Sequence, residues 1–177
     1  MFSFVERADY TIHQELSEWS RVANSNVIRA IADNSPLQNR IQANAGMIAL
    51  IQDGALVQPE DFRGVRDRAG NLQAGAIVTD MSESLYLEFL ASAPWNITGD
   101  LPRAVRRAAT MLMAQIVRES IDKGYGGRII VDAVGGTADF YQRMGFIETE
   151  QGAASTPEMA LTPEAARDFL DDVTGEQ

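Results

Sequence analysis

Three arginines, Arg103, Arg106 and Arg107, lie close together in a chain whose formal net charge is -10. Hydrophobic periodicity predicts a helix over residues 101–123, which places these arginines in its first turns. Cations at that end oppose the helix dipole and cost about 0.3–1 kcal/mol each. We therefore expect an anion such as a phosphate beside them. The alternative is a solvated surface patch in which the arginines pair with acidic neighbours.

Glu88 is a carboxylate inside a predicted strand, residues 84–91. Strand alternation places Tyr86, Glu88 and Leu90 on one face of that strand. Burying a carboxylate without a partner is expensive, so packing alone does not explain its presence. A chemical role and an ion pair with an arginine are the two explanations left open.

The composition argues against several classes of protein. The chain has no cysteine, which excludes a disulfide scaffold, a thiolate metal site and a cysteine nucleophile. The single histidine, His13, is interpreted as a polar position on an early helix, so we expect neither a metal site nor a Ser-His-Asp hydrolase. The negative charge argues against nonspecific nucleic-acid binding and is compatible with a cationic substrate.

The length and the hydrophobic pattern predict one globular domain. A chain of 177 residues with 45% apolar content is of single-domain size and can supply its own core. No apolar stretch reaches the length needed to span a membrane. We therefore expect a single domain over residues 1–177, located in the cytoplasm and without a membrane partner.

The predicted elements change type several times along the chain. Strands are predicted over residues 2–6, 62–67, 72–79, 84–91, 128–132, 146–150 and 158–161, and helices over residues 10–32, 36–52, 101–123, 137–144 and 163–170. Asp9 is predicted to cap the first helix, and the pair Asp53-Gly54 to end the second. Gly124 is predicted to cap the C-terminus of the third.

This order resembles the GNAT superfamily of acyl-CoA N-acyltransferases. The sharpest motif is the run DFYQRMGF at residues 139–146, which is similar to the family signature of an aromatic residue and Tyr, three variable residues, then Gly-Phe. The run LEFLASAPWN at residues 87–96 is similar to the end of the central strand in one bacterial subgroup. The resemblance implies an α/β (α+β) fold with a mixed central sheet of about six to seven strands flanked by helices.

The resemblance also implies a binding site for acetyl-CoA as co-substrate. In the family, the pantetheine arm lies along exposed backbone of the central strand, and the pyrophosphate meets the start of the next helix. The residues implied here are Leu90, Ala91, Ser92, Arg103, Arg106, Arg107, Ala108 and Ala109. The run RAVRRA at residues 103–108 agrees with the family's phosphate loop at its first and last positions, but Arg106 stands where glycine is expected. Glycine permits close backbone approach, whereas an arginine side chain must swing aside or contact the phosphate itself.

Two further residues are implied as catalytic. Tyr141 matches the family tyrosine that protonates or hydrogen-bonds the leaving CoA sulfur, although a core tyrosine beside Phe140 is the alternative. Glu88 matches the position of a glutamate that takes a proton from the acceptor amine, directly or through water. Asp132, on the strand before the Tyr141 helix, is the second candidate for that role.

The function implied by the resemblance is that of an N-acetyltransferase. It would transfer an acetyl group from acetyl-CoA to a primary amine of an unidentified small molecule or protein. The alternative, suggested by Arg106 at the glycine position, is a catalytically inactive GNAT-fold binding or regulatory protein that acts through a protein partner. A plain dimerisation module ranks last. A homodimer through the strands of residues 146–161 is also left open, since exposed late strands are natural dimer edges.

Overall fold

The computed structural model describes residues 2–134 and 136–175. Within these residues the strands are β1 (Ser3–Val5), β2 (Phe62–Arg66), β3 (Leu72–Asp80), β4 (Leu85–Ser92), β5 (Ile129–Asp132), β6 (Ile147–Ala153) and β7 (Thr156–Leu161). The helices are α1 (Tyr10–Ala32), α2 (Gln38–Val57), the short 3-10 helix η1 (Pro59–Asp61), α3 (Pro94–Thr98), α4 (Ala108–Asp122), α5 (Ala138–Gln142) and α6 (Pro163–Gly175). None of the helices within these residues is long and apolar enough to cross a membrane.

The strands form one mixed sheet in the order β1-β2-β3-β4-β5-β7-β6. The pairing of β4 with β5 is parallel, whereas β1 with β2, β2 with β3, β5 with β7 and β6 with β7 are antiparallel. The predicted mixed sheet of six to seven strands with helices is therefore confirmed. A parallel pair needs a crossover connection, and the segment from α3 through α4 supplies it.

The chain folds as two compact units. Unit 1 contains Met1–Ile77 and Phe89–Leu112, and unit 2 contains Val78–Glu88 and Met113–Gln177. Strands β3 and β4 and helix α4 each contribute residues to both units. The residues predicted to bind acetyl-CoA all fall in unit 1, and the two predicted catalytic residues both fall in unit 2.

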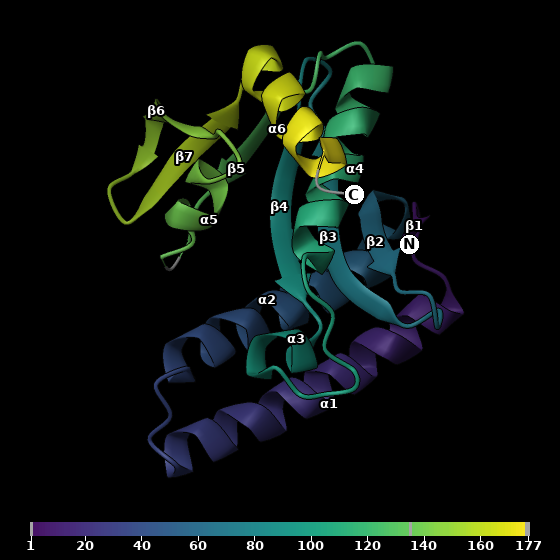
Figure 1. The fold of residues 1–177 in the computed structure, drawn as a ribbon, viewed down its shortest axis with the longest axis vertical. Coiled ribbons are helices and arrows are strands. Elements are labelled where there is room, and N and C mark those ends of the chain that lie inside the picture. Colours follow the sequence, from purple (N-terminus) through teal and green to yellow (C-terminus); the bar gives the residue numbers. More distant parts are fainter. Residues whose placement is uncertain (1, 135, 176–177) are drawn as a thin grey trace. The chain divides into compact units, whose positions relative to one another are not determined.

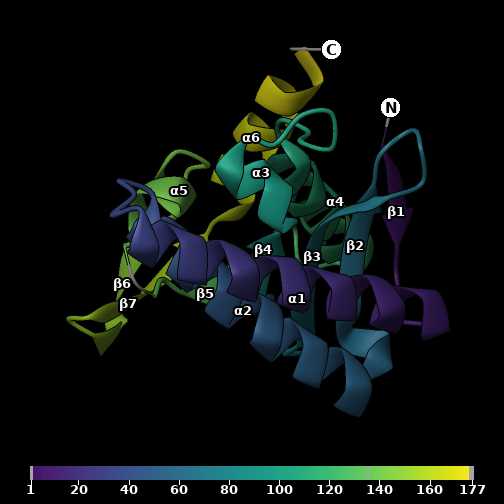
Figure 2. The ribbon, with the colours of Figure 1, turned by 90° about the horizontal axis from the view of Figure 1, so that it is seen from below.

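Unit 1 is built on two long helices, α1 and α2, that lie side by side (Figures 1 and 2). As predicted, Asp9 caps α1, because its carboxylate accepts a hydrogen bond from the Ile12 N–H at 2.9 Å. The buried face of α1 ends with Asn26 and Ala30, whereas Ile31 is 52% exposed. The core of the unit comprises Ala8, Ile12, Leu16, Trp19, Ala23, Ile48, Ile51, Ala55, Phe62, Leu72, Ile77, Ala91, Ala93 and Trp95.

Unit 2 contains the hairpin of β6 and β7, with α5 packed on β7 (Figure 1). Gly124 ends α4 as predicted: its N–H donates to the Ile121 carbonyl, and the Tyr125 N–H donates to the Ser120 carbonyl. The short loop that follows requires a second glycine. Gly127 has a φ of 93°, and a Cβ there would lie 2.5 Å from the Ala166 Cβ of α6.

The predicted end of the second helix is wrong. Residues Asp53-Gly54 do not end it, because α2 continues to Val57. Gly54 is instead a packing position inside the helix, where an added Cβ would lie 2.9 Å from Ile77 Cγ1. The close approach of a neighbouring side chain, and not a helix stop, explains this glycine.

The predicted start of the long helix is also wrong. Residues 94–98 form the separate helix α3, and α4 begins only at Ala108. The Val105 N–H donates to the Asn96 side chain at 2.7 Å and not to a helical carbonyl, and Arg107 has a φ of 66°, which is not helical. Arg103, Arg106 and Arg107 therefore precede α4 and do not lie in its first turn.

Replacing Asp9 with alanine tests the cap of α1. We expect Asp9→Ala to lower the free energy of unfolding by about 1 kcal/mol, because the Ile12 N–H loses its acceptor. Asp9→Asn keeps an acceptor oxygen and should change the free energy by only a few tenths. Urea titration followed by circular dichroism measures both. Equal losses in the two variants would show that the cap bond does not stabilise the helix.

Candidate functional site

The end of β4 carries hydrogen bonds on both of its edges. The Ala93 N–H donates to the Gln73 carbonyl of β3 at 3.0 Å. The backbone groups of the preceding residue, Ser92, face the opposite edge, since neighbouring residues of a strand alternate. There the side-chain amide of Asn44 from α2 pairs with them: it donates to the Ser92 carbonyl at 2.9 Å and accepts from the Ser92 N–H at 3.1 Å.

The N-terminus of α4 follows the predicted phosphate loop directly. The first hydrogen bond of the helix runs from the Met111 N–H to the Arg107 carbonyl at 2.9 Å. Helix geometry therefore leaves the N–H groups of Ala108, Ala109 and Thr110 without partners inside the helix. Free N–H groups at this end, together with the helix dipole, favour an anion. The predicted residues thus fit a phosphate group, although the arginines stand before the helix.

Arg103 is already engaged with protein groups. Its guanidinium carbon lies 3.7 Å from the centroid of the Trp95 ring, and its Nη2 lies 3.0 Å from Glu18 Oε1. A guanidinium stacked on an aromatic ring and paired with a carboxylate is well satisfied. A phosphate would have to compete with both contacts, so the predicted phosphate role of Arg103 stays a prediction.

Arg106 and Arg107 differ in backbone conformation. Arg107 occupies the left-handed region, which costs a residue other than glycine about 1–2 kcal/mol. Arg106, at the position where the family pattern expects glycine, does not have a positive φ. The departure from the pattern therefore does not force an arginine into a glycine conformation. The Arg106 side chain is exposed, and its guanidinium has no ion-pair partner among residues 2–134 and 136–175.

The loop between β4 and α4 is fastened to the buried side chain of Gln73. This side chain is 1% exposed, and its carbonyl oxygen accepts from Trp95 Nε1 at 3.0 Å and from Asn96 Nδ2 at 3.1 Å. Its amide nitrogen donates to Asp67 Oδ2 at 2.7 Å and to the Arg103 carbonyl at 3.4 Å. These bonds fix the segment that leads into the phosphate loop.

The motif around Tyr141 closes α5 as a Schellman motif. The Phe146 N–H donates to the Tyr141 carbonyl at 3.1 Å, and the N–H of Gly145, which has a φ of 93°, donates to the Gln142 carbonyl at 2.9 Å. The Phe146 ring packs on the Tyr141 ring, with centroids 5.4 Å apart. Backbone geometry and packing therefore explain Gly145, Phe146 and an aromatic residue at position 141.

The Tyr141 hydroxyl is not explained by packing. The residue is 6% exposed, and burial raises the pKa of its phenol. No hydrogen-bond partner for this hydroxyl is found in the described part of the chain, where Phe140 and Phe146 supply the ring contacts. A phenylalanine would pack equally well, so the hydroxyl is a candidate for a chemical role.

Glu88 is held by a threonine. Its Oε1 accepts a hydrogen bond from the Thr79 hydroxyl at 2.7 Å, and no arginine pairs with it within the described ranges. The ion pair that was the alternative explanation for this carboxylate is therefore not formed there. The predicted alternation is seen as well, because Leu85 and Leu87 are buried while Tyr86 and Glu88 are half-buried.

Asp132, the second candidate, accepts a hydrogen bond from the Tyr86 hydroxyl at 2.6 Å. This bond, together with burial and the charges of Asp132, Glu88 and Glu158, raises the pKa of Tyr86 to about 12. Asp132 pairs in register with Glu158 of β7. No hydrogen bond links Glu88 to Tyr141 in the described residues, so their joint action remains a prediction.

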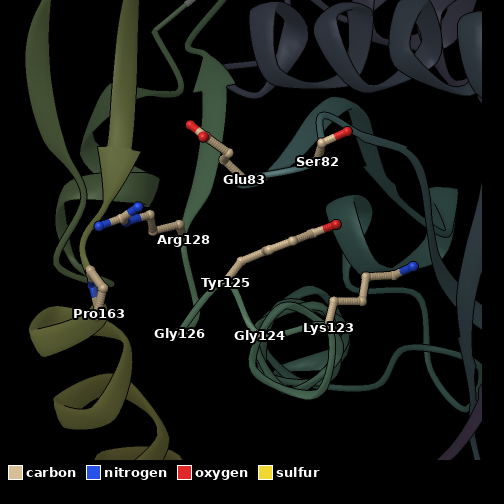
Figure 3. Close-up of a pocket in the computed structure, with 8 residues that line it drawn as sticks. All are labelled: Ser82, Glu83, Lys123, Gly124, Tyr125, Gly126, Arg128 and Pro163. Atoms are coloured by element: carbon tan, nitrogen blue, oxygen red, sulfur yellow. The ribbon is translucent and has the colours of Figure 1, made fainter.

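A cavity of about 530 Å³ in unit 2 is separate from all these residues (Figure 3). It is lined by Ser82, Glu83, Lys123, Gly124, Tyr125, Gly126, Arg128 and Pro163. In Figure 3 the Tyr125 and Lys123 side chains extend to one side and those of Glu83 and Arg128 to the other. Lys123 and Tyr125 both bind Asp80, at 3.0 and 2.8 Å, so they serve the local structure. None of the predicted site residues lines this cavity.

Three contacts at the site were not predicted from the sequence. Asn44 binds a residue 48 positions away, and Gln73 binds residues that are 22 and 23 positions away. Thr79 binds a residue 9 positions away. The available signals were weak: an asparagine inside a helix and a glutamine inside an otherwise apolar strand are polar exceptions to the pattern. No group of three His, Asp or Glu side chains able to hold a metal occurs among the described residues.

The sequence matches no protein-family model and no curated protein. Solved structures are similar in fold at low sequence identity. Ard1 from Thermoplasma volcanium is 14% identical, with a TM-score of 0.54 over 90% of this chain and 96% of that one. The PaiA N-acetyltransferase from Thermoplasma acidophilum, solved with coenzyme A, is 13% identical, with a TM-score of 0.56 over 92% and 99%. A GNAT-family acetyltransferase from Listeria monocytogenes is 11% identical, with a TM-score of 0.58 over 90% and 94%.

Replacing Gln73 with methionine tests the network that fastens the loop. Met has a similar length but no amide, so Trp95 Nε1 and the Asn96 amide would lose their shared acceptor. We expect Gln73→Met to lower the free energy of unfolding by about 3 kcal/mol, since buried unsatisfied polar groups cost about 1–3 kcal/mol each. Gln151→Met, at an exposed position of β6, is the control and should be nearly neutral. Urea unfolding of both proteins decides, and equal stability would contradict the role of Gln73.

Proposed function

We propose that this chain, which has the fold of the GNAT acetyltransferases, is an acetyl-CoA-dependent N-acetyltransferase that works as one domain on a primary amine. The observation that carries the proposal is the Tyr141 hydroxyl: it ends a buried side chain, is protonated, and has no hydrogen-bond partner in the described part of the chain, while its oxygen is not sealed from solvent. Packing does not require a hydroxyl at this position, whereas protonation of a leaving thiolate requires an acid.

Unit 1 supplies groups that suit the acetyl-CoA. The free N–H groups at the start of α4 and the exposed Arg106 guanidinium are matched to phosphate oxygens. The backbone of Leu90, Ala91 and Ser92 is assigned to the pantetheine arm, and the strand end that carries it is fixed by the Gln73 carbonyl. Arg107, Ala108 and Ala109 complete the proposed phosphate segment.

Unit 2 supplies the groups proposed for the chemistry. Glu88, with one oxygen bound by Thr79, takes a proton from the ammonium form of the acceptor through its other oxygen. The amine nitrogen then bonds to the thioester carbonyl carbon, and the bond from that carbon to sulfur breaks. The nitrogen loses its second excess proton as the amide forms, and this proton restores the Tyr141 phenol after it has protonated the sulfur. Burial raises the pKa of Tyr141, so its phenol is protonated at neutral pH and can give its proton to the departing sulfur.

Isothermal titration calorimetry with acetyl-CoA tests the proposal. We expect saturable binding with one site per chain, and no binding up to millimolar ligand would remove the basis of the proposal. A screen of CoA-thiol release against polyamines, amino acids, aminoglycosides and protein lysines would then identify the class of acceptor. Binding without turnover on any amine would favour the inactive GNAT-fold protein.

Arg106 provides a test of the phosphate contact. We expect Arg106→Ala to weaken acetyl-CoA binding about tenfold, because a charge-assisted hydrogen bond is worth about 1.5–3 kcal/mol. Binding of pantetheine, which lacks the pyrophosphate, should not change. Arg40→Ala, an exposed position on α2, is the control. Tighter binding by Arg106→Ala would indicate that this arginine obstructs a decayed phosphate site.

Tyr141 provides a test of the chemical step. We expect Tyr141→Phe to lower kcat about 100-fold and to leave acetyl-CoA binding nearly intact, since general acid catalysis contributes about 10²–10⁴-fold. The matched control is Tyr125→Phe, which removes a hydroxyl that binds Asp80 outside the proposed site. Steady-state thiol release gives kcat, and calorimetry gives the affinity. An unchanged kcat would remove Tyr141 from the mechanism.

A further inference from the structure

Asn44 presents a complete amide to the backbone of one residue of β4. Its Nδ2 donates to the Ser92 carbonyl at 2.9 Å, and its Oδ1 accepts from the Ser92 N–H at 3.1 Å. A neighbouring strand would satisfy a backbone in the same way, with one donor and one acceptor for the same residue. Asn44 thus acts as a single-residue substitute for a strand at the end of β4.

The edge that Asn44 occupies is the one assigned to the pantetheine arm. The Ala93 N–H is bound to the Gln73 carbonyl of β3, so the Ser92 groups face away from β3. Pantetheine contains two amide groups, each with an N–H and a C=O, so it offers the same hydrogen bonds as Asn44. The N–H and C=O of Ser92 cannot be fully bound by Asn44 and by pantetheine at the same time.

Asn44 can leave without a change of backbone. It lies in the interior of α2, which is held by the buried Ile41 and Ile48, and its own side chain is only half-buried. Rotation about its side-chain bonds would release the Ser92 groups while the helix stays in place. When pantetheine replaces Asn44, the number of hydrogen bonds to Ser92 does not increase. Occupation of the Ser92 groups by Asn44 therefore lowers the apparent affinity of the site for the pantetheine arm.

We propose that Asn44 holds the place of a pantetheine amide on β4 and is displaced when acyl-CoA binds, so that it sets the affinity of the site. This inference rests on the proposed function. It assigns to Asn44 a role in ligand affinity that neither the sequence pattern nor the resemblance to the GNAT superfamily provided.

The experiment compares Asn44→Ala with the wild-type protein by calorimetry. Two net hydrogen bonds are worth roughly tenfold or somewhat more in an equilibrium constant, so we expect Asn44→Ala to bind CoA and pantetheine about tenfold more tightly. Adenosine 3′,5′-bisphosphate, which lacks the arm, should bind both proteins equally. The matched control is Asn39→Ala, the same change at an exposed position of α2, which should bind all three ligands as wild type does.

A second variant keeps the inference testable if the first disturbs the fold. Asn44→Asp keeps the size of the side chain and the acceptor for the Ser92 N–H, but it loses the donor to the Ser92 carbonyl, so its affinity for pantetheine should also rise. Thermal unfolding confirms that each variant is folded. If wild type binds CoA and neither variant binds more tightly, the inference is wrong and the proposed function stands. If none of the proteins binds CoA, the proposed function is wrong and the inference is overturned with it.

Discussion

The end of β4 must satisfy backbone hydrogen-bonding groups on both edges, and the structure of unit 1 follows from how it does so. A buried peptide group without a partner costs about as much as a lost hydrogen bond, so each edge needs an occupant. On one edge the Gln73 carbonyl accepts from Ala93, and on the other the Asn44 amide pairs with Ser92. The Gln73 side chain then binds Trp95 and Asn96.

The loop before α4 takes its conformation from this arrangement. Asn96, held by Gln73, accepts from the Val105 N–H and so withdraws that group from helical pairing. Helix α4 therefore does not begin before Ala108. In the loop that precedes it, the Arg103 side chain stacks on the Trp95 ring. The position of the N–H groups at the start of α4 therefore depends on one glutamine buried in β3.

Much of the fold could be predicted from the sequence because local physics decides it. Strand alternation, the Asp9 cap and the Gly124 stop each depend on a few neighbouring residues, and each was found where expected. The start of α4 could not be predicted in this way, since it depends on the Asn96 side chain, which binds the N–H of Val105 nine residues later. Gly54 misled for the same reason: its packing against Ile77 is a contact distant in sequence.

The proposed catalytic residues show the same difference between local and distant contacts. Tyr141 and Glu88 could be chosen from a motif and from strand alternation, but their partners could not. The Schellman motif and the ring packing explain Gly145, Phe146 and an aromatic ring at position 141. Only the Tyr141 hydroxyl is not explained by the end of α5. For Glu88, the sequence left open a chemical role and an ion pair with an arginine. The structure shows instead a hydrogen bond from the Thr79 hydroxyl to one of its carboxylate oxygens.

The central claim is that the edge of β4 and the start of α4 together bind acetyl-CoA. The most direct measurement is a titration of the ¹⁵N-labelled protein with acetyl-CoA, followed by amide resonances. The account predicts saturable shifts at Ser92 and at Ala108, Ala109 and Thr110. Absence of shifts at these amides up to millimolar ligand, or saturable shifts confined to the residues around the cavity at Arg128, would contradict it.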